Sequence, residues 1–312
     1  MGDVPRVLTQ ISIRLLDRVV EAHPDVEIVP IPTHEPPPDG VEGDVLLTSA
    51  VGAPNLADVF PRGVRWVHAY GTGVNGFPFD LLGDRIFTCS RGASATAISE
   101  WVIAVMLAAE KQLPQYWLSE PPERWFSAPL GSLRGKSLAL IGFGGIAQAV
   151  ARRALPFDMQ VQALRRSAAK SPLASVRVVS SLEELLAEAD HVVLAAPLTP
   201  ATHHMIGDVA FALMKPGVHL VNIARGGLVD QDALRRALDS ERVGLATLDC
   251  VEPEPLPAGH WMYSHPRVRL SAHISWAAPG SYEGLIESFV DNLGRYRRGE
   301  KLDGIVDAKE RY

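Results

Sequence analysis

Short apolar runs alternate with polar or helical stretches along the chain, and this alternation is its main structural signal. In the first hundred residues the predicted strands lie at 6–8, 26–31, 45–48, 64–68 and 86–88. A predicted helix lies among them at 13–22. Strands that alternate with helices are typical of parallel β-α-β units. The proline-rich segment 32–40 cannot form regular structure and predicts a surface loop.

A second series of the same kind begins at Lys136. Its predicted strands lie at 137–141, 159–164, 191–195, 218–223, 244–248 and 268–271. Its predicted helices lie at 145–155, 181–188, 207–213, 230–239 and 281–298. The two series predict an α/β protein with two Rossmann-like domains, each a doubly wound parallel sheet. Ligands of such sheets bind at the carboxyl ends of the strands.

A long apolar segment separates the two series. Residues 95–112 are apolar nearly all round, which predicts a helix buried between two bodies of structure. Pro114 ends this helix, because proline cannot continue it. Residues 121–131 hold several prolines without a clear period and predict a connector.

Length and charge narrow the class of protein. The 312 residues suit two domains better than one. The net charge of -6 argues against a nucleic-acid partner, since such proteins usually carry a basic excess. No apolar run is long enough for a membrane span, and the N-terminus lacks the pattern of a secretory signal. Two cysteines are too few for a disulfide framework, so we expect a reduced, cytoplasmic compartment.

The strand predicted at 137–141 leads directly into a glycine-rich loop. Gly142, Gly144 and Ala147 form G-x-G-x-x-A between a strand and a helix, the setting of the dinucleotide fingerprint. The first glycine allows a tight turn, and the second lets the backbone approach a pyrophosphate. With Gly145 and Ile146, the helix N-terminus offers free N–H groups to the phosphates. A glycine turn without a ligand and a methyltransferase loop are the alternatives.

The next predicted strand ends at about Leu164 and is followed by Arg165, Arg166 and Ser167. An acidic residue there would bind the ribose 2′-hydroxyl of NAD. Two guanidinium groups and a hydroxyl suit a 2′-phosphate instead, because arginine presents a planar fork of donors. The sequence therefore predicts that NADP(H) is preferred, with NAD(H) possible. The alternative is a pair of solvent-facing arginines.

Polar residues follow three late strands, in the segments 220–230, 246–257 and 271–276. Because each comes just past an apolar strand, we expect all three segments to face one crevice. Neither His203 and His204 nor His219 forms a spaced set of metal ligands with an acidic residue, and we predict no metal.

Several long motifs together carry a family resemblance. In chain order they are RWVHAYGTGVN, ISEW, GFGGIA, PLTPATHHMIG, MKPGVHLVNIARGGLVD, LDCVEPEPLP and SAHIS, spanning roughly residues 64–290. The chain closely resembles the D-isomer-specific 2-hydroxyacid dehydrogenases. Within that family it looks most like the NADPH-preferring glyoxylate/hydroxypyruvate reductases.

The resemblance implies roles for four residues. Arg225 would hold the substrate carboxylate and polarise the keto oxygen, with a fork geometry that fits a carboxylate. His273 would protonate that oxygen while hydride arrives from the nicotinamide. Glu254 would orient the imidazole, and Asp249 would bind the nicotinamide carboxamide. Glu252 is the alternative to Glu254, since both precede a proline.

The resemblance also assigns binding residues. Further cofactor-binding positions are Pro197, Thr202 and Ala224. The substrate carboxylate would lie against the loop of Tyr70, Gly71, Thr72 and Gly73, where glycines let backbone N–H groups face an anion. A plain glycine turn is the alternative. Trp276 either lines the substrate pocket or only packs.

The implied organisation has a flavodoxin-like substrate domain at 1–97 and 283–312 and a dinucleotide domain at 98–282. The active site would lie in the interdomain cleft, and the protein would be a homodimer. Two alternatives of function stay open. One is a dinucleotide-sensing corepressor of the same fold, and the other is a related enzyme acting on formate or phosphonate.

Overall fold

The computed structural model describes residues 4–12, 15–166 and 171–312. The chain forms two compact units. Unit 1 comprises Met1–Ser94 and Ala278–Tyr312, and unit 2 comprises Ala95–Ala277. The sequence places the corresponding boundaries after residues 97 and 282, three and five residues later.

Unit 1 contains a sheet of five parallel strands in the order β2-β1-β3-β4-β5. The strands are β1 (Val7–Thr9), β2 (Ile28–Pro30), β3 (Val45–Ser49), β4 (Trp66–Tyr70) and β5 (Ile86–Cys89). This is the flavodoxin-like strand order.

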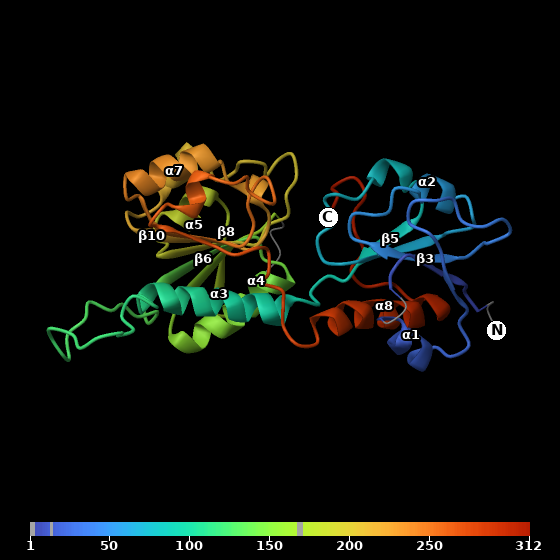
Figure 1. Ribbon diagram of the computed structural model, residues 1–312, viewed down its shortest axis with the longest axis horizontal. Helices are drawn as coiled ribbons and strands as arrows, with labels where there is room; N and C mark the ends of the chain where they lie inside the picture. Colours follow the sequence, from blue (N-terminus) through green and yellow to red (C-terminus); the bar gives the residue numbers. More distant parts are fainter. Residues whose placement is uncertain (1–3, 13–14, 167–170) are drawn as a thin grey trace. The chain divides into compact units, whose positions relative to one another are not determined.

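Helices cover both faces of the sheet in unit 1 (Figure 1). On one face α1 (Asp17–Ala22) packs with α8 (Ser281–Arg297), and on the other lie α2 (Leu56–Val59) and the 3₁₀ turn η2 (Phe79–Leu81). The C-terminal α8 is part of this core, because Phe289 stacks on Trp66 of β4 with ring centroids 5.4 Å apart. The end of the chain thus completes the unit that its beginning starts.

Unit 2 contains a sheet of seven parallel strands in the order β12-β11-β10-β9-β6-β7-β8. The strands are β6 (Ser137–Ile141), β7 (Gln160–Leu164), β8 (Val176–Val179), β9 (His191–Leu194), β10 (Val218–Asn222), β11 (Val243–Leu248) and β12 (Val268–Leu270). The order reverses between β6 and β9. In doubly wound sheets the ligand binds at the carboxyl ends of the strands beside such a reversal.

Helices again cover both faces of this sheet (Figure 1). One face carries α3 (Ala95–Glu110) and α4 (Gly145–Ala154), and the other carries α5 (Leu182–Leu186), α6 (Asp208–Leu213) and α7 (Gln231–Asp239). Short 3₁₀ turns complete the unit: η3 (Leu155–Phe157), η4 (Gly226–Leu228) and η5 (Trp261–Tyr263). Within the described parts of the chain, no helix has the length and apolar character needed to cross a membrane.

The structure departs from the sequence-based expectations in three places. The strand β8 and the one-turn helix α2 are additional elements, each only four residues long. Helix α3 buries one face, through Ile98, Val102 and Met106, whereas Ala104 is exposed. The sequence predicted a helix buried on all sides, whereas in the structure of the single chain α3 is buried on one face only.

Candidate active site

The glycine-rich loop joins β6 to α4 at the carboxyl edge of the unit 2 sheet. Gly142 has φ +91°, in the left-handed region that favours glycine. A Cβ atom at this position would lie 2.7 Å from both the Ala195 carbonyl oxygen and the Ala196 nitrogen. The turn therefore requires glycine at 142 on grounds of both conformation and space.

Gly144 has a different environment. It is the N-cap of α4, and a Cβ atom there would meet nothing within 4 Å. Gly145 and Ile146 form the first turn, whose N–H groups have no carbonyl partners within the helix. Ala147 is fully buried, which lets the helix pack closely on the sheet. The open space beside free N–H groups fits a pyrophosphate.

Arg165 and Arg166 follow β7 directly, at the same edge of the sheet. Leu164, the last residue of β7, pairs with Ile141, the last residue of β6. The segment with the two arginines therefore starts beside the start of the glycine-rich loop. Arg165 is half-buried and Arg166 is exposed. Ser167 lies outside the described residues.

The loop after β9 carries Pro197 and Thr202. The Thr202 hydroxyl donates to the Pro197 carbonyl at 2.7 Å and accepts from the backbone N–H of Thr199 at 2.8 Å. These bonds fix the loop from within, so its backbone rather than the threonine hydroxyl is the part available to a ligand.

Asn222, at the end of β10, organises the loop that holds Arg225, and sequence reasoning missed it. Its Nδ2 donates to the Arg225 carbonyl at 2.9 Å, and its Oδ1 accepts from the Ala224 N–H at 3.1 Å. The next glycine, Gly226, packs so closely on Val251 that a Cβ atom would overlap the Val251 backbone. The Arg225 loop is therefore held against the segment that follows β11. The asparagine in N-x-A-R-G-G was the available signal.

Asp249, at the end of β11, holds the loop that carries His273. The Asp249 side chain is almost fully buried and accepts from the Ser271 hydroxyl at 2.5 Å. It also accepts from the backbone N–H groups of Ile274 at 2.9 Å and Ser275 at 3.0 Å. Asp249 thus acts as a positioning residue for His273, a role that the sequence did not predict. Its contact with a nicotinamide stays a prediction.

His273 lies against Glu254. Its Nδ1 is 2.8 Å from Oε2 of Glu254, while Oε1 of Glu254 accepts from the Val251 N–H at 3.0 Å. His273 has φ +55°, an unusual backbone conformation that the bonds to Asp249 maintain. Glu252 is not part of this pair, and its carboxylate lies near His203 and His204.

Trp276 has a packing role in unit 2. Its indole N–H donates to the His273 carbonyl at 2.9 Å. This bond closes the short turn 273–276, and the Trp276 ring packs against the core of unit 2.

The predicted substrate loop lies in unit 1 at the end of β4. The Ser90 N–H donates to the Gly71 carbonyl at 2.9 Å, and a Cβ atom on Gly71 would lie 2.7 Å from that of Ala50. The Tyr70 hydroxyl donates to the Tyr282 carbonyl at 3.1 Å, and burial raises the pKa of Tyr70 to about 12. Tyr70 is therefore an uncharged donor. Thr72 and Gly73 follow in the same turn.

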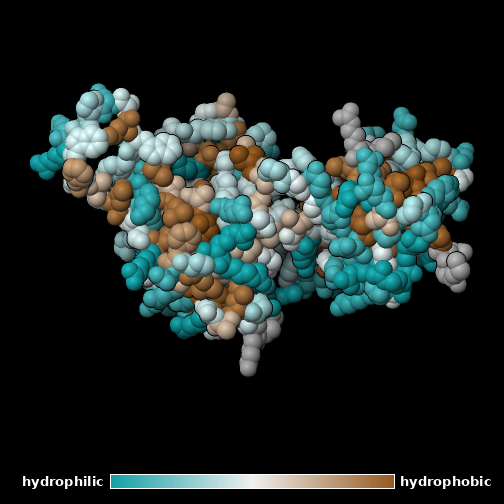
Figure 2. All heavy atoms as spheres, turned by 90° about the horizontal axis from the view of Figure 1, so that it is seen from below, coloured by the Kyte–Doolittle hydropathy of each residue, from teal (hydrophilic) through white to brown (hydrophobic). Residues whose placement is uncertain are grey.

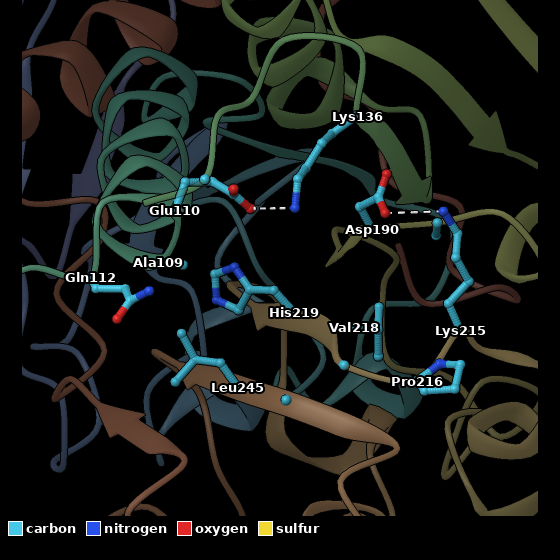
Figure 3. Close-up of a pocket in the computed structure, with 14 residues that line it drawn as sticks. Ala109, Glu110, Gln112, Lys136, Asp190, Lys215, Pro216, Val218, His219 and Leu245 are labelled. Carbon is cyan, nitrogen blue, oxygen red and sulfur yellow. Dashed lines mark hydrogen bonds and ion pairs between the residues drawn. The ribbon is translucent and has the colours of Figure 1, made fainter. Parts of the chain in front are cut away.

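A cavity of about 380 Å³ lies at the opposite, amino edge of the unit 2 sheet (Figure 3). Its charged walls are paired: Lys136 lies 2.9 Å from Glu110, and Lys215 lies 3.0 Å from Asp190. Burial alone would raise the pKa of Glu110. Hydrogen bonds from His191 and Lys136 outweigh that effect and lower the pKa to about 2. The cavity contains none of the residues predicted to act in catalysis.

Three comparisons with known proteins agree on the family. The family model for the "D-isomer specific 2-hydroxyacid dehydrogenase, NAD binding domain" matches residues 103–275, more than half of the chain. A glyoxylate reductase of Thermococcus gammatolerans is 45% identical over 176 residues, covering 55% of this chain and 52% of that relative. One from Thermococcus litoralis is 32% identical over 232 residues, covering 70% and 69%. For the first relatives, the match therefore spans only about half of their length.

Solved structures extend the likeness over the whole chain. A D-isomer specific 2-hydroxyacid dehydrogenase from Xanthobacter autotrophicus Py2, solved with NADPH and MES, has a TM-score of 0.85 at 23% identity. The alignment covers 99% of this chain and 100% of that one. At this identity the likeness shows the fold. With the family model and the curated relatives, it leads to one assignment: the chain belongs to the D-isomer specific 2-hydroxyacid dehydrogenase family.

Proposed function

We propose that the protein transfers hydride between NAD(P)H and a 2-keto acid to give a D-2-hydroxy acid. The observation that carries the proposal is the 2.8 Å contact between His273 and Glu254, both of which follow strands of the unit 2 sheet. The Arg225 loop and the glycine-rich loop lie at the carboxyl edge of the same sheet. The arrangement of these loops at one edge of the sheet and the membership of the family both support hydride transfer to a 2-keto acid.

Each residue of the trio has a distinct task. Arg225 binds the substrate carboxylate and polarises the keto oxygen, because its guanidinium offers two parallel donors. His273 gives a proton to that oxygen through the ring nitrogen that does not face Glu254. Glu254 orients the imidazole and stabilises its positive charge. The hydride itself comes from the bound dinucleotide.

We propose a small 2-keto acid of the glyoxylate or hydroxypyruvate type as substrate. The support is that several relatives of this chain are glyoxylate reductases. In unit 1, the loop of Tyr70, Gly71, Thr72 and Gly73 is proposed to bind the carboxylate. The corepressor alternative is not favoured, since the comparisons name reductases and dehydrogenases.

We propose that NADP(H) is preferred over NAD(H). Arg165 and Arg166 stand after β7, where an acidic residue would select NAD. Gly142, Gly144, Gly145 and Ile146 are proposed to hold the pyrophosphate. Pro197, Thr202, Ala224 and Asp249 are proposed to border the rest of the dinucleotide.

A homodimer is proposed from exposed apolar surface on unit 2. Residues 111–131, which we call the arm, extend away from the rest of the unit (Figure 1). The side of unit 2 that carries α3 and α4 also shows hydrophobic side chains at its surface (Figure 2). The exposed large hydrophobic residues of the arm are Tyr116, Trp117, Leu118, Trp125, Phe126 and Leu130. Such surface is unusual on a monomer and is typical of an interface.

The compartment stays a prediction. We propose the reduced, cytoplasmic compartment expected from the two cysteines of the sequence.

The test is a panel of 2-keto acids with both cofactors. The purified protein is mixed with NADPH or NADH and with glyoxylate, hydroxypyruvate or phenylpyruvate. Oxidation of the cofactor is followed by the loss of its nicotinamide absorbance. We expect turnover of a small 2-keto acid and a higher kcat/KM with NADPH. With hydroxypyruvate or phenylpyruvate, whose products are chiral, we expect the D-configured product. Arg225→Lys should lower kcat/KM, because a point charge replaces the fork. Absence of turnover with every keto acid would overturn the proposal.

A further inference from the structure

Three potential metal ligands meet at the candidate active site of unit 2, and one of them has no part in the proposed reaction. Cys250, Glu254 and His273 each offer one ligand atom, and these atoms all lie within 4.8 Å of one another. Hydride transfer needs Glu254 and His273 but not the thiol. The question is what a sulfur atom beside this pair can do.

We propose that Cys250, Glu254 and His273 form an inhibitory binding site for a thiophilic divalent metal ion such as Zn²⁺ or Cd²⁺. This site is distinct from a metal cofactor, which the sequence does not predict. The inhibitory effect rests on the proposed function, whereas binding of the ion does not.

The donor set suits such an ion. Thiolate sulfur, imidazole nitrogen and carboxylate oxygen are the three ligand types that Zn²⁺ takes in proteins, and three protein ligands leave one position for water. The Cys250 side chain is almost fully buried, whereas those of Glu254 and His273 are 38% and 40% exposed. An ion can therefore enter from the solvent side and meet the sulfur at the bottom of the site.

The backbone around the three ligands is held in place. The Cys250 carbonyl accepts from Asn222 Nδ2 at 3.3 Å, and the His273 N–H donates to the Asp249 carbonyl at 3.0 Å. Glu254 is tied to the Val251 N–H. The ligands are thus brought together by the fold and need only small side-chain movements.

An ion bound to Nδ1 of His273 and Oε2 of Glu254 excludes their catalytic contact on geometric grounds. Neighbouring ligand atoms around tetrahedral zinc are about 3.3–3.6 Å apart, given its bond lengths. His273 Nδ1 and Glu254 Oε2 are 2.8 Å apart, so their contact must open by roughly half an ångström. The ion forms bonds to the sulfur, a ring nitrogen and a carboxylate oxygen. The thiol proton and the proton shared by His273 and Glu254 pass to the buffer.

A second cluster of possible ligands provides the internal comparison. His203, His204 and Glu252 also place ligand atoms within 4.8 Å, but all three residues are exposed and none offers sulfur. The two imidazole rings are stacked, with centroids 3.8 Å and planes 23° apart. Their lone pairs run nearly parallel, so one ion cannot lie in both ring planes unless a ring turns.

The test uses Cd²⁺ with the full-length protein and two matched variants. Cd²⁺ bound to a thiolate gives a charge-transfer band in the ultraviolet, which exposed histidines and carboxylates do not give. We expect the band in the wild type and in Cys89→Ala, and its loss in Cys250→Ala. Cys250→Ser serves as a second variant if the alanine variant does not fold.

Inhibition is measured in parallel with the band. Cd²⁺ and Zn²⁺ should inhibit keto-acid reduction, and EDTA should restore it. In Cys250→Ala the half-inhibitory concentration should rise by about tenfold or more, since even indirect partners of a metal site change affinity that much. A band that persists in Cys250→Ala, or Cd²⁺ binding without a band, would overturn the site. Failure of keto-acid turnover would instead remove the proposed function, while the band still decides whether the site exists.

Discussion

His273 Nδ1 lies 2.8 Å from Glu254 Oε2, while Glu252, two residues earlier, lies beside His203 and His204. The two Glu-Pro pairs of the loop after β11 are thus directed to different places. A carboxylate that touches an imidazole holds the ring in one orientation and favours its charged, proton-donating form. Of the two glutamates, only Glu254 therefore lies where its carboxylate can act on the His273 ring.

Exchanging each glutamate for glutamine separates the two. We expect Glu254→Gln to lower kcat for keto-acid reduction by about a hundredfold, because the amide cannot support the imidazolium. Glu252→Gln is the matched control and should retain kcat within about twofold. A loss confined to Glu252→Gln would contradict the assignment.

The two glycines of the dinucleotide loop should respond differently to alanine. Gly142→Ala places a Cβ atom against Ala195 and Ala196 in a left-handed conformation, which we expect to cost about 2 kcal/mol or more of stability. Gly144→Ala meets no protein atom and should lose less than about 1 kcal/mol. It should nevertheless weaken NADPH binding by about tenfold, since the methyl group occupies the space proposed for the pyrophosphate.

Thermal unfolding and fluorescence titration with NADPH check this pair of variants. Equal destabilisation of both would show that the space beside Gly144 is filled by protein. Unchanged NADPH affinity in Gly144→Ala would show that the pyrophosphate lies elsewhere.

The parallel sheets were predictable because each β-α unit carries its own apolar period and its own terminators. The strand at 137–141 and the helix that begins at Gly145 agree with the structure to within a residue. The strand β8 was missed because Val176–Val179 is four residues long and one of them is arginine. A short edge strand has too few apolar positions to show a period.

The candidate site was predictable as residue types but not as a network. The motifs of the family resemblance made Arg225, Glu254 and His273 the predicted catalytic residues, whereas the bonds that hold their loops depend on strand order. Asp249 reaches the backbone of Ile274 and Ser275, about 25 residues later, only because β11 and β12 are neighbours. Local sequence carries no record of that adjacency, so the positioning roles of Asp249 and Asn222 emerge only from the fold.

The proposed dimer predicts that the arm controls the oligomeric state. Trp117 and Trp125 are 72% and 67% exposed, and replacing both with serine should raise the dissociation constant of the dimer by about a hundredfold. Light scattering after gel filtration measures the mass at several concentrations. Val209→Ser is the control, because Val209 is 79% exposed but lies on α6, outside the arm. A dimer that withstands the double substitution would exclude the arm as its main contact.

A buried histidine makes unit 1 sensitive to acid. His68 is fully buried, and its neutral ring completes a chain of bonds in which the Thr88 hydroxyl donates to Nδ1 and Nε2 donates to Ser90 Oγ. Ser90 Oγ in turn donates to the Leu285 carbonyl. Thr88 also accepts from the Trp66 indole. A proton on Nδ1 would therefore leave the Thr88 hydroxyl without its acceptor.

Burial lowers the pKa of His68 from 6.5 to about 3. Between these values the unfolded chain binds a proton that the native protein does not, so the unfolding free energy falls as the pH falls. The slope from this group is about 1.4 kcal/mol per pH unit. His68→Asn should reduce the slope between pH 6 and 4 in urea unfolding followed by tryptophan fluorescence. The exposed His34 is the control, and an equal slope in His34→Asn and His68→Asn would show that His68 is not the titrating group.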